Sequence, residues 1–159
     1  MRAKRISLAA SKTVQGFTLV EVLIALIIMS VGMLGIAGLY VHSMQAGRTS
    51  LFRHQAVTIA GDVADRIRAN PKAAGAYAVA GGADNNCVDG GINCTPAAMA
   101  ANDIFLWGIQ AADALPTGTV TIVFDNAPVP PTYQITVRWS EPGQVQAMTY
   151  SITIPVFPI

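Results

Sequence analysis

A single carboxylate in a long apolar stretch is the feature of this chain with the clearest chemical meaning. Glu21 is the only Asp, Glu, Lys or Arg between Lys12 and Arg48, and it lies inside the apolar run Phe17–Val41. A charged side chain near the middle of a bilayer costs on the order of 2.5–3.5 kcal/mol on insertion scales. An acid at such a position therefore indicates a function that uses its charge.

The two cysteines form the second candidate site. Cys87 and Cys94 are separated by six residues, and in an oxidising compartment such a pair is expected to form a disulfide. The chain-entropy model gives so short a loop roughly 2.5 kcal/mol of stabilisation at most. A metal site would need more ligands nearby, and His42 and His54 lie far away on a predicted helix. We therefore expect a structural disulfide and no metal.

Other patterns favour neither a calcium site nor an enzyme. Asp84, Asn86 and Asp89 resemble part of a calcium loop, but the fifth position counted from Asp84 is Val88, which offers no oxygen ligand from its side chain. The chain contains no Ser/His/Asp or Cys/His set, no HExxH and no phosphate-binding loop. We expect a non-enzymatic protein without a cofactor.

Composition divides the chain into a basic start and an acidic remainder. The chain has 159 residues, which suggests one domain, and only 12% of them are charged, against about 25% in an ordinary soluble domain. Four Lys or Arg and no acid occupy the first sixteen residues, whereas the rest has six basic and nine acidic residues. An acidic remainder argues against nucleic acid as a partner.

The apolar run has the length of a membrane span. Its 25 residues would extend roughly 37 Å as a helix, enough to cross a hydrocarbon core of about 30 Å. It is too long for the apolar region of an ordinary secretory signal. The positive-inside rule leaves the basic leader in the cytoplasm and places the rest of the chain on the far side of the membrane.

The helix is predicted to continue from Phe17 to about Ala69. Its second half carries an apolar stripe at helical spacing, formed by Phe52, Ala56, Ile59, Ala60, Val63 and Ile67. Asp62 with Arg66, and Asp65 with Arg68, have the spacing of ion pairs along one helix. Asn70-Pro71 should end the helix, because the residue before a proline is disfavoured in helical geometry.

The remainder is predicted to be a loop, a short helix and a sheet. Residues 70–94 are rich in Gly, Ala, Asp and Asn and read as loop. Thr95 and Pro96 suit a helix start, and the helix over residues 96–114 should carry Phe105, Ile109 and Ala112 on one face. Three alternating strands follow within residues 119–157, with a type II turn at residues 141–144. The apolar stripe should cover this antiparallel sheet.

The start of the chain resembles the type IV pilin and pseudopilin superfamily: a basic leader, Gly16, then Phe17-Thr-Leu-Val-Glu21 and an apolar helix. This resemblance implies that a prepilin peptidase cleaves between Gly16 and Phe17 and that Phe17 is N-methylated. It implies an α+β, ladle-shaped fold with a long N-terminal helix packed on a C-terminal antiparallel β-sheet. The parts would be a cleaved leader (1–16), a transmembrane and filament-core helix (17–41) and a periplasmic head (42–159).

Cleavage would create a partner for Glu21. The new α-amine on Phe17 stays charged near neutral pH, and a buried carboxylate is tolerated when it is paired. The amine of the same chain lies four residues away, roughly 6 Å along the helix. The amine of a neighbouring subunit would serve equally if the helices are staggered, and this is the assembly role that the superfamily implies. Alternatively, Glu21 only reaches toward the membrane surface.

Weaker features suggest a branch of the superfamily. Residues 65–71, the cysteine pair, Trp107 and the alternation ending at Trp139 resemble the minor pilins called PilV, or type IV pilus modification proteins. The resemblance implies a minor pilin that supports pilus assembly or modification, and hence adhesion and twitching motility. Its partners would be other minor pilins, the major pilin, the prepilin peptidase and the inner-membrane assembly platform. It would reside in the bacterial inner membrane and then in the surface pilus.

Two other functions remain open at this point. Minor pseudopilins of type II secretion share the same N-terminal pattern. A binding module at a fibre tip is the other alternative, and the loop Gly81–Cys94 would be its site.

Gly32, Gly35 and Gly38 either form a close-packing helix face or are ordinary membrane-helix glycines. Both tryptophans, Trp107 and Trp139, are expected in the core of the head.

Overall fold

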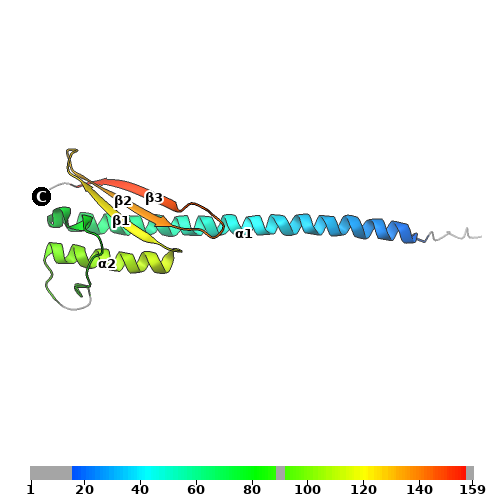
Figure 1. Cartoon of the computed structure of the whole chain (residues 1–159), viewed down its shortest axis with the longest axis horizontal. Helices are drawn as coiled ribbons and strands as arrows, with labels where there is room; N and C mark the ends of the chain where they lie inside the picture. The colour runs from blue at the N-terminus through cyan, green and yellow to red at the C-terminus, as the bar shows by residue number, and fades with distance from the viewer. Residues whose placement is uncertain (1–15, 89–91, 157–159) are drawn as a thin grey trace, which may run out of the picture. The chain divides into compact units, whose positions relative to one another are not determined.

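The computed structural model describes residues 16–88 and 92–156, and the chain separates into two compact units, Met1–Met44 and Gln45–Ile159 (Figure 1). Most of the expected leader, together with Asp89, lies outside the described residues. The long helix α1, Leu19–Ala69, contributes to both units. It begins two residues later than predicted, because Phe17 and Thr18 are not helical.

The first unit consists, within the described residues, of the non-helical residues 16–18 and the apolar part of α1. Its side chains are all exposed, from Leu19 with 87% exposure to Met44 with 66%. This is the one described helix that is long and apolar enough to cross a membrane, judged by length and composition. An apolar helix that buries no face within its own chain needs lipid or other subunits around it.

The second unit, which we call the head, has a core built on the predicted stripe of α1. Ala56, Ile59, Ala60, Val63 and Ile67 are buried as expected. Ala64 is buried as well, and Phe52 is only half-buried at the margin of the core. Alanine alternates with Ile and Val along this face.

The sheet is an antiparallel meander in the order β1-β2-β3. The strands are β1 (Thr119–Asp125), β2 (Thr132–Trp139) and β3 (Met148–Pro155). Alternate residues face the core, and the register aligns them in rows such as Ile122, Ile135 and Ile152. The central strand β2 buries all of its inward residues, from Tyr133 to Trp139. Edge strands β1 and β3 are less buried because each has one neighbour.

The connection between β2 and β3 contains the predicted type II turn. Gly143 has a positive φ of 87°, which this turn requires at its third position. The Gln144 amide donates to the Glu141 carbonyl at 3.0 Å. The motif Glu-Pro-Gly-Gln was therefore sufficient to predict the local backbone.

Residues 71–78 correct the prediction of a continuous loop. They form a 3₁₀ helix, η1, Pro71–Ala78. Its Tyr77 is 1% exposed and contacts the rings of Trp107 and Tyr133, with centroids 5.8 and 6.3 Å away. The composition of this segment resembled that of a loop, because one large residue among alanines and glycine shows no helical periodicity. Burial of that one ring holds the segment against the core.

Helix α2, Pro96–Ala114, spans the predicted range, but the face that carries Phe105, Ile109 and Ala112 is not the buried one. The Thr95 side chain accepts a hydrogen bond from the Ala98 amide at 3.2 Å, as expected for an N-cap. The buried face carries Ala100, Asn102, Asp103, Trp107 and Ala111, whereas Ile109 and Ala112 are exposed. Small and polar residues form much of the buried face, so the positions of the large apolar residues did not indicate which face is buried.

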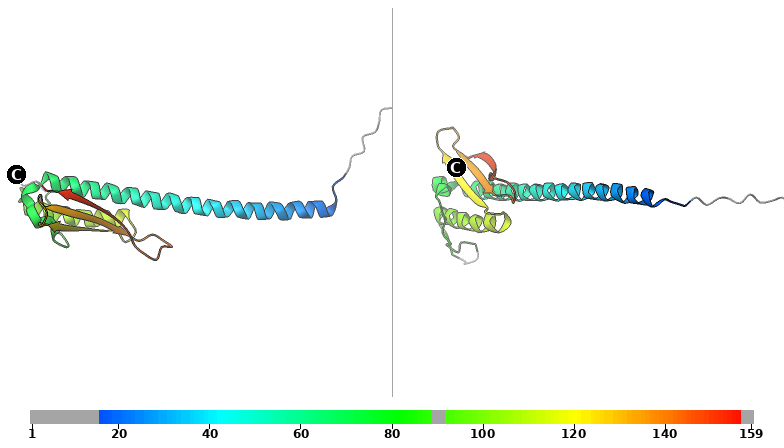
Figure 2. Two further views of the ribbon diagram at one scale, coloured as in Figure 1. Left: turned by 90° about the horizontal axis from the view of Figure 1, so that it is seen from above. Right: turned by 45° about the vertical axis from the view of Figure 1, so that its right-hand side comes forward.

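The helices of the head share one face of the sheet, and all of them contribute to a single core (Figure 2). Trp107 of α2 and Trp139 of β2 are 2% and 1% exposed, which confirms both as core residues. The opposite face of the sheet exposes mostly polar side chains, and there the hydroxyls of Thr136 and Ser151 lie 2.8 Å apart. The head is therefore a two-layer α+β structure, as predicted.

Candidate functional site

The expected processing site lies in non-helical backbone just before α1. Gly16, Phe17 and Thr18 are outside the helix. The Thr18 side-chain oxygen accepts a hydrogen bond from the Glu21 amide at 3.3 Å, so Thr18 acts as the N-cap. Thr18 and Glu21 have the Thr-x-x-Glu spacing of a capping box, which marks this helix start in the sequence. The bond between Gly16 and Phe17 is thus two residues from the first turn.

Glu21 is exposed on the apolar helix, in a shallow recess of about 330 Å³. Apart from Glu21, the recess is lined by apolar side chains: Phe17, Val22, Ala25, Leu26 and Met29. None of the ion pairs found among the described residues involves Glu21. The geometry presents one carboxylate among apolar side chains, and wherever water is excluded from such surroundings the attraction between this carboxylate and a cation is stronger than in water.

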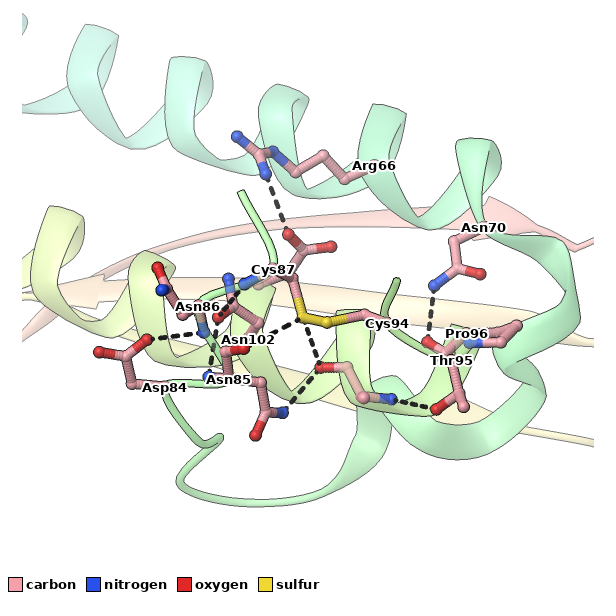
Figure 3. The surroundings of a disulfide bond; sticks show 12 residues. Arg66, Asn70, Asp84, Asn85, Asn86, Cys87, Cys94, Thr95, Pro96 and Asn102 are labelled. Carbon is pink, nitrogen blue, oxygen red and sulfur yellow. Dashed lines mark hydrogen bonds and ion pairs between the residues drawn. A yellow bond between two sulfur atoms is a disulfide. The ribbon is translucent and has the colours of Figure 1, made fainter. Parts of the chain in front are cut away.

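The cysteines form the predicted disulfide. Cys87 and Cys94 are bonded, with their Cα atoms 5.8 Å apart (Figure 3). The bond closes a loop next to the first turn of α2, because Thr95 and Pro96 follow Cys94 directly. It ties the chain that leaves η1 to the start of α2.

The loop containing Cys87 is also held along α2 by hydrogen bonds. The buried Asn102 side-chain oxygen accepts from the amides of Asn85 and Cys87, at 2.9 and 3.4 Å (Figure 3). The Ala83 amide donates to the Ala101 carbonyl at 2.9 Å. A Cβ at Gly82 would collide with the backbone of α2. Part of the predicted loop Gly81–Cys94 is therefore held against α2, although several of its residues are exposed.

Local geometry explains the residues that resembled a calcium loop. The Asp84 carboxylate accepts a hydrogen bond from the Asn86 amide at 3.1 Å, which is a short-range turn. Asn86 adopts a positive φ of 52°, a conformation that Asn tolerates. Among the described residues, no group of three or more His, Cys, Asp or Glu is placed to hold a metal ion.

A buried polar cluster joins α1, η1 and α2. Asp103 of α2 is 3% exposed. One of its oxygens pairs with Arg66 Nη1 at 2.9 Å, and the other accepts from the Tyr77 hydroxyl at 3.0 Å. Asn70 Nδ2 lies 3.1 Å from the Tyr77 hydroxyl and 2.9 Å from the Pro96 carbonyl, to which it donates. The cluster fixes the end of α1 against the beginning of α2.

The predicted pairs along α1 are present, and one of them extends into this cluster. Arg66 lies 3.4 Å from Asp62, and Arg68 lies 3.0 Å from Asp65. The Asp62 carboxylate also accepts from Trp107 Nε1 at 2.9 Å. Sequence spacing identified the pairs within the helix, but it could not identify Asp103 and Trp107 as partners of Arg66 and Asp62, because they are distant in sequence.

Charge and burial shift the pKa values in the cluster. Burial alone would lower the pKa of the Arg66 guanidinium, but the nearby Asp62 charge and the Asp103 hydrogen bond raise it overall. Burial raises the pKa of Tyr77 to about 12, although the hydrogen bond with Asn70 opposes the shift. Arg66 thus remains charged and Tyr77 protonated at neutral pH. These states suit a structural joint rather than proton-transfer catalysis.

Comparisons with known proteins agree with the sequence pattern. The profile of the prokaryotic N-terminal methylation motif matches residues 11–37. The profile described as type IV pilin Tt1218 matches residues 38–105, which include the second half of α1, η1 and the disulfide. No curated protein and no solved structure matches the chain. The matched pilin family is structural and non-enzymatic. Two adjacent matches, together with the long helix on an antiparallel sheet, support placing this chain in the type IV pilin superfamily.

Proposed function

We propose that the protein is a minor pilin of the PilV type that enters a type IV pilus and supports its assembly or modification. The observation that carries the proposal is the lone Glu21 on an apolar helix, directly preceded by a motif for cleavage and methylation. The match to a type IV pilin profile favours a pilus over a secretion pseudopilus. The resemblance of the head to PilV, from residue 65 onward, supports the minor role.

The proposed processing occurs between Gly16 and Phe17. The prepilin peptidase would act while the leader is cytoplasmic and the head is periplasmic, with α1 spanning the inner membrane. The non-helical backbone of residues 16–18 supports this site, because an extended peptide can enter a protease cleft whereas a helical one cannot. N-methylation of Phe17 would keep the positive charge on its amine.

Glu21 would then pair with the Phe17 amine of a neighbouring subunit. The apolar groove around Glu21 leaves room for the end of another chain. An ion pair in such surroundings gains much more than one in water, so it would set the stagger between subunits. The partners would be other minor pilins, the major pilin and the inner-membrane assembly platform.

Processing and assembly are tested together with Glu21→Gln, with Val20→Ala as the control on the same turn. We expect sheared fibres of the wild type to contain a chain that starts at N-methylated Phe17. Glu21→Gln should be cleaved normally but be at least tenfold depleted from fibres, since it lacks the charge. Normal incorporation of Glu21→Gln would refute the pairing. A fibre protein that retains the leader would refute the processing.

A further inference from the structure

A second charged recess lies in the head, where α1 enters it. Its volume is about 280 Å³, close to the lower limit of small-molecule pockets, roughly 300 Å³. Arg48 and Thr49 line it from α1, and Glu141 and Gln144 line it from the turn between β2 and β3. It therefore offers a cation and a carboxylate to the same ligand. Neither Arg48 nor Glu141 takes part in the ion pairs of the described residues.

The carboxylate in this recess is buried and held by neutral groups. Glu141 is 7% exposed. Its two oxygens accept from the Thr49 hydroxyl at 2.6 Å and from Trp139 Nε1 at 3.1 Å. A carboxylate can accept about four hydrogen bonds, so acceptor capacity remains. A buried charge without a counter-ion is unfavourable, and a cationic ligand group would improve its environment.

In the membrane-inserted state of the proposed function, the part of α1 that lines the recess follows closely after the apolar run. Tyr40, which is 70% exposed, ends the apolar run with the kind of residue enriched at that surface. Arg48 is seven residues beyond Val41, or about 10 Å along the helix. Helical side chains tilt toward the N-terminus, and Arg reaches toward polar headgroups. Its guanidinium can therefore reach the headgroup layer, which is roughly 5–8 Å thick.

An apolar side chain stands beside the recess. Val145 follows Gln144 in the same connection and is fully exposed. A fully exposed valine next to a charged recess suits a surface that meets both lipid chains and headgroups.

We propose that the recess binds the zwitterionic headgroup of phosphatidylethanolamine while the protein resides in the membrane. Arg48 donates hydrogen bonds to the phosphate, and the lipid ammonium donates to Glu141. Phosphatidylcholine fits less well because its quaternary ammonium has no N–H, and phosphatidylglycerol brings no cation. The inference rests on the membrane insertion contained in the proposed function. The bound lipid would hold the head on the membrane surface before the subunit is extracted into a fibre.

The test uses the full chain in nanodiscs that contain equal parts of the three lipids, with the lipid retained on the protein measured by native mass spectrometry. We expect wild type to retain phosphatidylethanolamine preferentially. Arg48→Met should weaken that retention about tenfold, the loss of one charge-assisted contact. Arg53→Met removes an exposed arginine of the same helix that does not line the recess, and should change nothing.

Vesicle flotation of each protein separates the two hypotheses. Failure of wild type to float would refute the membrane insertion itself. Flotation without lipid preference, or equal effects of Arg48→Met and Arg53→Met, would overturn the headgroup site alone. Unchanged lipid retention combined with loss of Arg48→Met from fibres would also overturn it, in favour of a contact between subunits.

Discussion

Removing the Asp103 carboxylate tests whether the polar cluster stabilises the head. Asp103→Ala deletes one ion pair with Arg66 and one buried hydrogen bond from Tyr77. Hydrogen bonds to a charged group contribute about 1.5–3 kcal/mol each. The contribution of Arg66 lies at the low end, because its side chain is 43% exposed and retains Asp62 as a partner.

Together these terms predict a loss of about 3 kcal/mol in the free energy of unfolding, since Tyr77 also keeps a buried hydroxyl without its acceptor. For a head of this size, the Tm should fall by about 10–15 °C. The measurement is thermal unfolding of the full chain in detergent, followed by tryptophan fluorescence, because Trp107 lies in the same core.

Asp113→Ala is the matched control, since Asp113 is an exposed acid on the same helix. It should change the Tm by less than about 2 °C, as is usual for surface substitutions. A double-mutant cycle with Tyr77→Phe should give a coupling energy of about 1–2 kcal/mol. If Asp103→Ala proved no more harmful than Asp113→Ala, the cluster would not contribute to stability and the reasoning would be refuted.

Two further predictions concern Tyr77 and the glycines of the head. The folded pKa of Tyr77, about 12, exceeds its ordinary value of 10.0, so its contribution to stability is complete below pH 10 and is lost as the pH rises toward 12. Wild type should therefore lose more Tm than Tyr77→Phe over this pH range, and parallel curves would contradict the assignment. Gly118→Ala should destabilise by about 1–3 kcal/mol, because its Cβ would collide with the Ala111 carbonyl. Gly108→Ala, where a Cβ meets open space on α2, should stabilise by about 0.5–1 kcal/mol in the same unfolding assay, and equal effects of the two would be inconsistent with this packing.

Short-range features of the head could be predicted because their causes are local. The N-cap at Thr95, the turn at residues 141–144 and the pair Asp62–Arg66 each involve residues at most four positions apart. The strands could be predicted from alternation, and the register of β2 with its neighbours brings most apolar residues to one face, with the exposed Val123 as an exception. Patterns of this kind depend on backbone geometry alone.

Other features could not be predicted because they depend on distant neighbours. Asp103 looks like a surface acid until α1 brings Arg66, 37 positions away, to 2.9 Å. Glu141 looks like a turn residue until Thr49, 92 positions away, donates to it. The composition of η1 resembled that of a loop. The large apolar residues of α2 did not indicate its buried face, because alanines and polar residues line that face.

The sequence by itself determined that a single acid, Glu21, lies in a long apolar helix. A lone acid in an apolar helix can be recognised from the polarity of its neighbours along the chain, without knowledge of the fold. The tertiary structure alone decided which polar groups of the head are buried and joined. Burial and ion pairing across the core depend on how α1, η1, α2 and the sheet approach one another, and no spacing along the chain encodes those distances.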